Sequence, residues 1–267
     1  MSRALFGHLW RSNRTRLLIV CVALGAWSVF LPIIYGSFGQ QIKQVVDSGL
    51  FPKELMNFGG GDPFSLGGAI ALGYIHPIAI VLVSIFAIGF TTSAVAGERQ
   101  RGTLETILAR PVGRRTLYVT LLVALVVFVG AILASSIVGT IVGSALAGVL
   151  GELPSGRLPL LWLNGMLLWV AIGAIGLAAS VSFDRLTPAL GVTLTIVIVS
   201  YFLEILGSLW PDAKGLQSYS IFHYLAAKDV LAGTVDAFGF GLLVAVIAIA
   251  IGWALAVFPR RDLAAPS

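Results

Sequence analysis

Six long runs of the sequence contain no charged residue, and they constrain the fold more than any other feature. The runs cover residues 17–42, 63–97, 116–151, 158–183, 186–203 and 237–259. Each is close to, or longer than, the roughly 20 residues that cross a bilayer as an α-helix. Strands of a membrane β-barrel would be about 10 residues long and would alternate polar with apolar positions. That alternation is absent, so the sequence predicts an all-α integral membrane protein with six transmembrane helices.

The composition excludes an ordinary soluble domain. Only 11% of the residues are charged and 58% are hydrophobic, and the mean hydropathy is +0.97. Soluble domains carry about 25% charged residues. We expect a single transmembrane domain over residues 1–267, with spans at about 17–35, 70–96, 117–150, 159–181, 186–206 and 238–258.

The distribution of basic residues predicts the topology. If the N-terminus is cytoplasmic, 12 of the 17 Lys and Arg residues lie on that side: Arg3, Arg11, Arg14, Arg16, Arg99, Arg101, Arg110, Arg114, Arg115, Arg185, Arg260 and Arg261. The other five are Lys43, Lys53, Arg157, Lys214 and Lys228. The positive-inside rule then places both termini in the cytoplasm. Topology therefore explains the net charge of +5, and we expect no nucleic-acid partner.

Residues 3–11 alternate apolar side chains with Arg3 and Arg11. This pattern predicts an amphipathic helix in the headgroup layer of the membrane lipid, broken at Ser12-Asn13 before the first span. A frayed basic terminus is the alternative. An outer loop is predicted from Gly36 to about Gly68.

Two further patterns concern the second and third runs. Ser135, Gly139, Gly143 and Ala147 recur at every fourth position, which predicts a close contact between helices. Pro77, near the outer end of the second run, is expected to kink that span.

A short, charge-dense segment, residues 98–115, separates the second run from the third and must lie in water. Leu104, Ile107 and Leu108 occupy one helical face, while Glu105 is turned away from it.

Thr103 is placed to cap the start of this helix, and Pro111 is placed to end it. The predicted product is about two turns of amphipathic helix that offer a small apolar surface to a soluble partner. The alternative is a solvated loop whose charge only sets the topology.

Familiar catalytic motifs are missing from the sequence. It has no Walker motif, no zinc-ligand spacing and no Gly-x-Ser-x-Gly elbow. Glu204 directly follows the fifth run, near the outer end of the predicted span, and it is either a buried functional carboxylate or a residue that reaches water within one turn. His76 has no second ligand at a useful spacing. Energy for any transport should therefore come from another subunit.

Residues 97–115 resemble the cytoplasmic coupling segment of ABC type-2 exporter permeases. The matching positions are Glu98, Gly102, Thr103, Leu104, Glu105, Leu108, Pro111 and Arg114. Residues 219–224 before the last span also agree with the family, as does the ending at Phe258, Arg261 and Asp262. The sequence departs from the pattern at Ile221, where a Pro often follows the Ser.

The resemblance implies that the transport path and ATP hydrolysis belong to different subunits. Two permease chains, identical or different, would form the pore, and two separate ATP-binding-cassette subunits would bind ATP and Mg²⁺ and hydrolyse the ATP. This chain would bind no cofactor itself and would reside in a bacterial or archaeal plasma membrane. The residues expected to couple to the ATPase are Glu98, Arg99, Arg101, Gly102, Thr103, Leu104, Glu105, Ile107, Leu108, Pro111 and Arg114.

In that family the path walls come largely from the first, second and fifth spans. Here the candidate path residues are Phe86, Phe90, Thr193, Thr195, Ser200, Tyr201 and Glu204. Such a lining favours export of an amphipathic or lipophilic compound. The alternatives are a permease-like scaffold or sensing subunit and, less favoured, an intramembrane enzyme, for which clustered acids or a His pair are missing.

Overall fold

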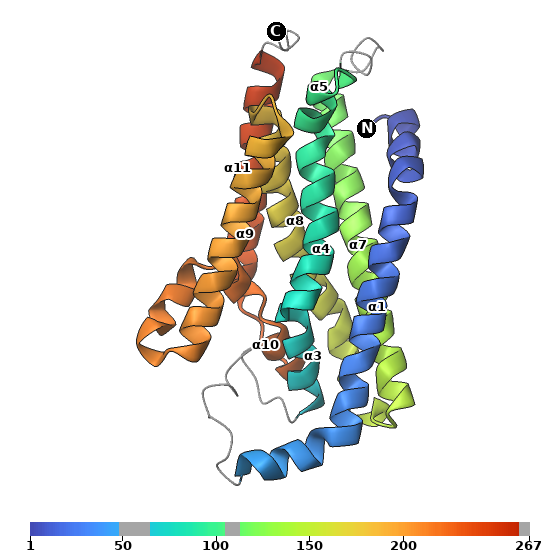
Figure 1. Ribbon diagram of the computed structural model, residues 1–267, viewed down its shortest axis with the longest axis vertical. Helices are drawn as coiled ribbons and strands as arrows, with labels where there is room; N and C mark the ends of the chain where they lie inside the picture. Colours follow the sequence, from blue (N-terminus) through green and yellow to red (C-terminus); the bar gives the residue numbers. More distant parts are fainter. Residues whose placement is uncertain (48–64, 105–112, 262–267) are drawn as a thin grey trace.

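The computed structural model describes residues 1–47, 65–104 and 113–261. In this part of the chain, six helices are long and apolar enough to cross a membrane. They belong to α1 (Arg3–Asp47), α4 (Pro77–Thr92), α7 (Arg114–Leu146), α8 (Leu158–Ser182), α9 (Leu186–Leu209) and α11 (Ala237–Arg260). The helices run side by side along the long axis of the molecule (Figure 1). The predicted all-helical membrane fold with six spans is confirmed.

Small residues bring α1 and α7 into close contact. A Cβ atom added to Gly139 would lie 2.3 Å from the carbonyl oxygen of Gly25, and one added to Gly143 would lie 2.3 Å from that of Val29. The hydroxyls of Ser28 and Ser136 lie 2.7 Å apart in the same interface. The small-residue stripe predicted on the third span therefore does form a helix contact, and α1 is its partner.

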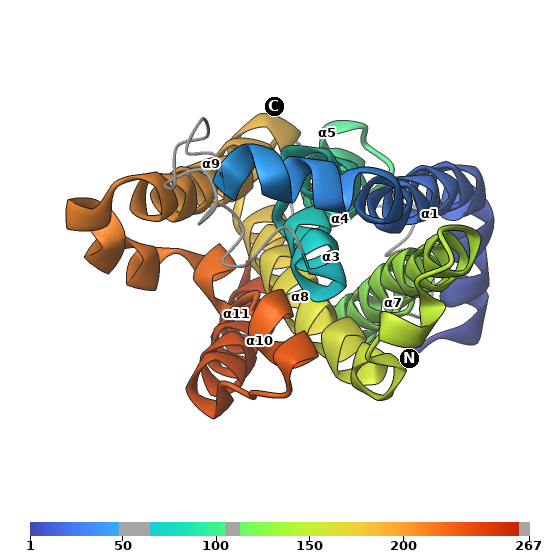
Figure 2. The same ribbon diagram turned by 90° about the horizontal axis from the view of Figure 1, so that it is seen from below.

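Helix α8 is the most buried span and occupies the middle of the bundle, where it contacts α4, α7, α9 and α11 (Figure 2). Beside it, aromatic side chains fill the space between α4 and α7. Phe86 and Phe90 of α4 meet the ring of Phe128 edge-on, with centroid distances of 5.5 and 5.4 Å. Trp10 approaches the same ring from α1 at 5.8 Å.

The predicted break at Ser12-Asn13 is wrong, because α1 continues through these residues. The Asn13 side chain donates to the carbonyl of Leu9 one turn earlier, and so remains compatible with the helix. The backbone N–H of Ser2 donates to the Thr120 hydroxyl. The amphipathic segment therefore packs on α7 of its own chain and is not a separate interfacial helix.

The second span is also shorter than predicted, because Pro77 does not kink it but starts it. His76 has an extended backbone between α3 (Leu66–Ile75) and α4, as expected for a residue that precedes proline. Its ring nitrogen accepts a hydrogen bond from the backbone N–H of Ile78 and caps α4. Residues 70–75, predicted to lie in the span, belong to α3.

The segments predicted to lie outside the membrane contain more helix than expected. Residues 36–47 continue α1, and its last turns bend away from the bundle and cross the end opposite residues 98–101 (Figures 1 and 2). The third span ends at Leu146, four residues earlier than predicted, and Gly148 follows with a positive φ of 72°. The segment after α9 forms two 3₁₀ helices, η4 (Pro211–Tyr219) and η5 (Ile221–Tyr224), and a short helix, α10 (Ala227–Ala232).

The α1–α7 contact predicts a strong effect of one methyl group. Gly143→Ala would place a Cβ against the Val29 carbonyl oxygen, so the two helices must separate. We expect the free energy of unfolding to fall by about 1–3 kcal/mol, measured by denaturant titration in detergent micelles. Gly252→Ala is the matched control, because no atom lies within 4 Å of the added Cβ. Equal stability of the two variants would contradict this packing.

Candidate functional site

The strongest concentration of charged and hydrogen-bonded side chains lies at one end of the bundle, which we call the charged end. It comprises α5 (Glu98–Gln100) with residues 101–104, the start of α7, the α8–α9 link at residues 183–185, and the last turn of α11. The N-terminus lies toward the same end (Figure 1). The predicted coupling segment enters and leaves the bundle here.

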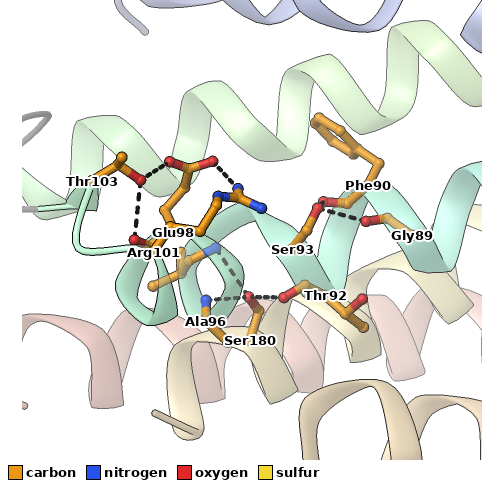
Figure 3. Close-up of polar contacts among 10 residues, drawn as sticks. Gly89, Phe90, Thr92, Ser93, Ala96, Glu98, Arg101, Thr103 and Ser180 are labelled. Carbon is orange, nitrogen blue, oxygen red and sulfur yellow. Dashed lines mark hydrogen bonds and ion pairs between the residues drawn. The ribbon is translucent and has the colours of Figure 1, made fainter. Parts of the chain in front are cut away.

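A π-helical turn, η1 (Ser93–Gly97), joins α4 to the charged segment. The buried hydroxyl of Ser180 on α8 accepts hydrogen bonds from the backbone N–H groups of Val95 and Ala96, both at 3.0 Å. It donates its own proton to the carbonyl of Thr92 at 2.7 Å. Figure 3 shows this hydroxyl set between the two sides of the turn. Single π-helical turns inside α-helices occur frequently at functional sites.

The charged segment then folds back on itself. Arg101 and Thr103 both donate to the carboxylate of Glu98, and the Thr103 hydroxyl also lies 3.1 Å from the Glu98 carbonyl oxygen (Figure 3). Gly102 makes the reversal possible, because its φ of 70° lies in the left-handed region that side chains disfavour. Leu104 resumes helical geometry at the limit of the described segment.

Asp184, in the α8–α9 link, binds two cations from other elements. Arg99 of α5 lies 2.5 Å from its carboxylate, and Arg261 at the end of α11 donates to the same oxygen. Arg261 also donates to the carbonyl of Val181 at 2.9 Å. Gln100 adds a further contact, since its side-chain oxygen accepts from the backbone N–H of Leu186 at 2.9 Å. These contacts fasten the charged segment to both α8 and α9.

Arg114, the first residue of α7, contacts the end of α11 at the charged end. Its guanidinium donates to the carbonyls of Phe258, Pro259 and Arg261, at 3.3, 3.2 and 2.7 Å. The last carbonyls of a helix have no partner within the helix, and a cation there also complements the helix dipole. Arg114 therefore holds the end of α11 against α7.

The structure changes the predicted docking surface. Leu104 is only 2% exposed and packs in the core of this chain, so its assignment to an exposed apolar surface is wrong. The other residues assigned to that helix lie outside the described residues: Glu105, Ile107, Leu108 and Pro111. The cations Arg99 and Arg101, expected to pair with the ATPase, have acidic partners within the chain.

An apolar groove of about 660 Å³ runs between α4 and α9. Within the described part of the chain, no charged side chain lines this groove. The lining residues are Pro77, Ile80, Val81, Ser84, Ile85, Ile88, Gly89, Leu190, Leu194, Val197, Ile198, Tyr201, Phe202 and Ile205. Tyr201 is the one candidate path residue among them. The other lining side chains were missed, because an uninterrupted apolar run does not reveal which side of a helix faces a groove.

The remaining candidate path residues do not gather in one place. Phe86 and Phe90 are buried in the aromatic core against α7. Thr193 is buried and donates to the carbonyl of Ala189 on its own helix, whereas Thr195 is exposed. Ser200 is buried as well.

Glu204 lies at the opposite end of α9 and is largely covered. Its side chain is 12% exposed. Gln217 of η4 donates to one carboxylate oxygen at 3.0 Å, and a ring nitrogen of His223 lies 3.8 Å from the other. Gln217 and His223 were missed, since nothing in the sequence links them to Glu204. The structure thus covers most of the Glu204 side chain, and a part for this carboxylate in transport stays a prediction.

The described residues form a bundle of six apolar helices with a hydrogen-bonded charged segment at one end and an apolar groove between two spans, which is the architecture of an integral membrane protein. Among the described residues, no group of three or more His, Cys, Asp or Glu side chains is placed to hold a metal ion. A family model described as ABC-2 family transporter protein matches residues 6–263. The chain therefore belongs to the ABC-2 transporter family, as its resemblance to that family's permeases indicated. No curated protein matched the chain.

The serine contact predicts a local change in dynamics. Ser180→Ala removes three hydrogen bonds from the π-helical turn, and each buried bond contributes about 1 kcal/mol. We expect amide hydrogen exchange at residues 93–97 to become at least about 10-fold faster. Ser182→Ala on the same helix is the control, because its hydroxyl bonds Ala178 and Trp253 instead. Unchanged exchange in Ser180→Ala would contradict the assigned contacts.

Proposed function

We propose that this chain is the permease subunit of an ATP-driven exporter. Two copies, or one copy and a related chain, enclose the path, and separate ATP-binding-cassette subunits bind and hydrolyse ATP. The exported compound is amphipathic or lipophilic. The membership of the ABC-2 family supports the transport role, and the apolar groove between α4 and α9 supports the substrate class.

The single observation that carries the mechanism is the attachment of the charged segment to α8 and α9. Arg99 and Gln100 contact the α8–α9 link, while Ser180 holds the turn that leads from α4 into the segment. A force applied to the segment by an ATPase would therefore act on α4, from which the segment continues, and on α9, and these are the two helices that border the groove. Residues Glu105, Ile107, Leu108 and Pro111 would provide the docking surface beyond the described part of the segment.

The exposed face of α9 supports a second copy of the permease. Ile198 and Phe202 are 63% and 61% exposed on a helix that borders the groove. In a single chain one side of the groove is open, and a second chain would enclose it. The alternative function is a permease-like scaffold or sensing subunit, which would bind the ATPase without exporting any compound.

Asp184 provides the test of coupling. Asp184→Arg places a cation beside Arg99 and Arg261 and so separates the charged segment from the α8–α9 link. We expect the variant to assemble with the ATPase but to lose at least about 10-fold of the ATP hydrolysis that depends on the permease, since each repulsive contact costs about 1 kcal/mol. Hydrolysis is measured on the purified complex in lipid nanodiscs.

Asp184→Asn should give an intermediate loss, because it removes the two attractions without adding repulsion. Asp212→Arg is the matched control, since Asp212 is exposed on η4 at the opposite end of the bundle. Parental hydrolysis by Asp184→Arg would contradict the coupling route. Failure of the parental chain to capture any ATP-binding-cassette subunit would contradict the proposed function itself.

A further inference from the structure

A cation from α1, Arg16, lies against one residue that lines the groove, although Arg16 is not itself among the lining residues. If a Cβ atom were added to Gly89 of α4, the two terminal nitrogens of Arg16 would lie 3.3 and 3.5 Å from it. Gly89 itself lines the groove, together with Ile85 and Ile88 of α4 and Leu190 of α9. Because Gly89 has no side chain, the guanidinium of Arg16 approaches the backbone of a groove-lining residue directly.

The depth of this contact is unusual for a charge. Gly89 precedes Glu98 by roughly two and a half helical turns, so the guanidinium lies beside the body of α4 and not at the charged end. From the sequence, Arg16 marks the start of the first span, one residue before a charge-free run. A charged side chain at the level of membrane-spanning helices is energetically costly and commonly marks a pathway for ligands or ions.

Arg16 also has no counter-ion in residues 1–47, 65–104 and 113–261, and no hydrogen bond engages its guanidinium there. The acids at the charged end are already engaged: Glu98 binds Arg101, and Asp184 binds Arg99 and Arg261. The Arg16 side chain is exposed. A positive charge is thus presented beside an apolar groove that contains no charged residue of its own.

We propose that Arg16 selects the charge of the exported compound. The groove takes the apolar part of an amphiphile, and Arg16 binds a single anionic group on it, such as a carboxylate or a phosphate ester. The planar guanidinium suits such groups because it donates two parallel hydrogen bonds to them. This assignment rests on the proposed export function for the statement that the occupant is the substrate, and it deepens that function by naming the substrate class.

Binding can be tested without ATP. The probe is 11-(dansylamino)undecanoic acid, and its neutral amide is the matched compound with the same apolar part. Fluorescence titration uses the purified full chain in phosphatidylcholine nanodiscs. We expect the acid to bind at least about 10-fold more tightly than the amide, since one charge-assisted contact is added.

Variants at Arg16 and Ile198, with a control at Arg14, distinguish the contribution of the positive charge to binding from that of the apolar groove. Arg16→Gln should remove the preference by weakening only the acid, and Arg16→Lys should retain most of it. Arg14→Gln is the control, because Arg14 lies two residues away and about 200° around α1. Ile198→Trp, which fills the groove from α9, should weaken the acid and the amide alike.

Three results would overturn the proposal. The first is a preference for the acid that survives in Arg16→Gln, and the second is parental binding of both compounds to Ile198→Trp. The third is full displacement of the acid by adding phosphatidylglycerol to the nanodiscs, which would assign the site to a resident lipid. If the acid binds as expected but the complex with the ATPase exports neither compound into vesicles, the proposed function fails while the anion site stands.

Discussion

The hydroxyl of Ser180 forms three hydrogen bonds with a stretch of buried backbone at the end of α4. A buried backbone group without a hydrogen-bond partner costs about 1–3 kcal/mol, so a helix that departs from α geometry in a buried place needs a partner. The π-helical turn at the end of α4 has that partner on α8. Because of this contact, the charged segment that follows begins from a fixed position on the most buried helix of the bundle.

The remaining contacts at the charged end extend that attachment. Asp184 joins α5 to the α8–α9 link and to the end of α11, and Arg114 holds the end of α11 against α7. The individual ion pairs are half exposed and contribute little to stability. Their main effect is to hold the charged segment in a fixed position against α8, α9 and α11. Elsewhere in the bundle, close packing of small residues fixes α1 against α7. The groove lies between α4 and α9, and α9 is exposed along much of its length.

The sequence predicts the six spans well, because uninterrupted apolar runs are the strongest signal a membrane protein carries. The end points and interruptions are less predictable. Pro77 reads as a kink from sequence, yet the backbone preference of the preceding His76 ends one helix and begins another. The candidate site is harder to predict from the sequence than the spans. The pattern around Leu104 fits an exposed amphipathic helix, but tertiary packing buries that side chain. Ser180 and Asp184 carry no such signal in the sequence, since the nearest of their partners in the chain, Arg261, is 77 residues from Asp184.

The most direct measurement is a pair of spin-label distances in the complex with the ATPase, with and without bound ATP, in a Cys21→Ser background. Labels at Arg101 and Arg185 report on the charged segment and the α8–α9 link, and labels at Ile85 and Ile198 report on the width of the groove. If the charged segment and the link move as one body, the distance between labels at Arg101 and Arg185 stays constant on ATP binding. The distance between labels at Ile85 and Ile198 then changes by more than about 2 Å. A change in the first distance with an unchanged groove would contradict the coupling of the charged end to the α4–α9 groove.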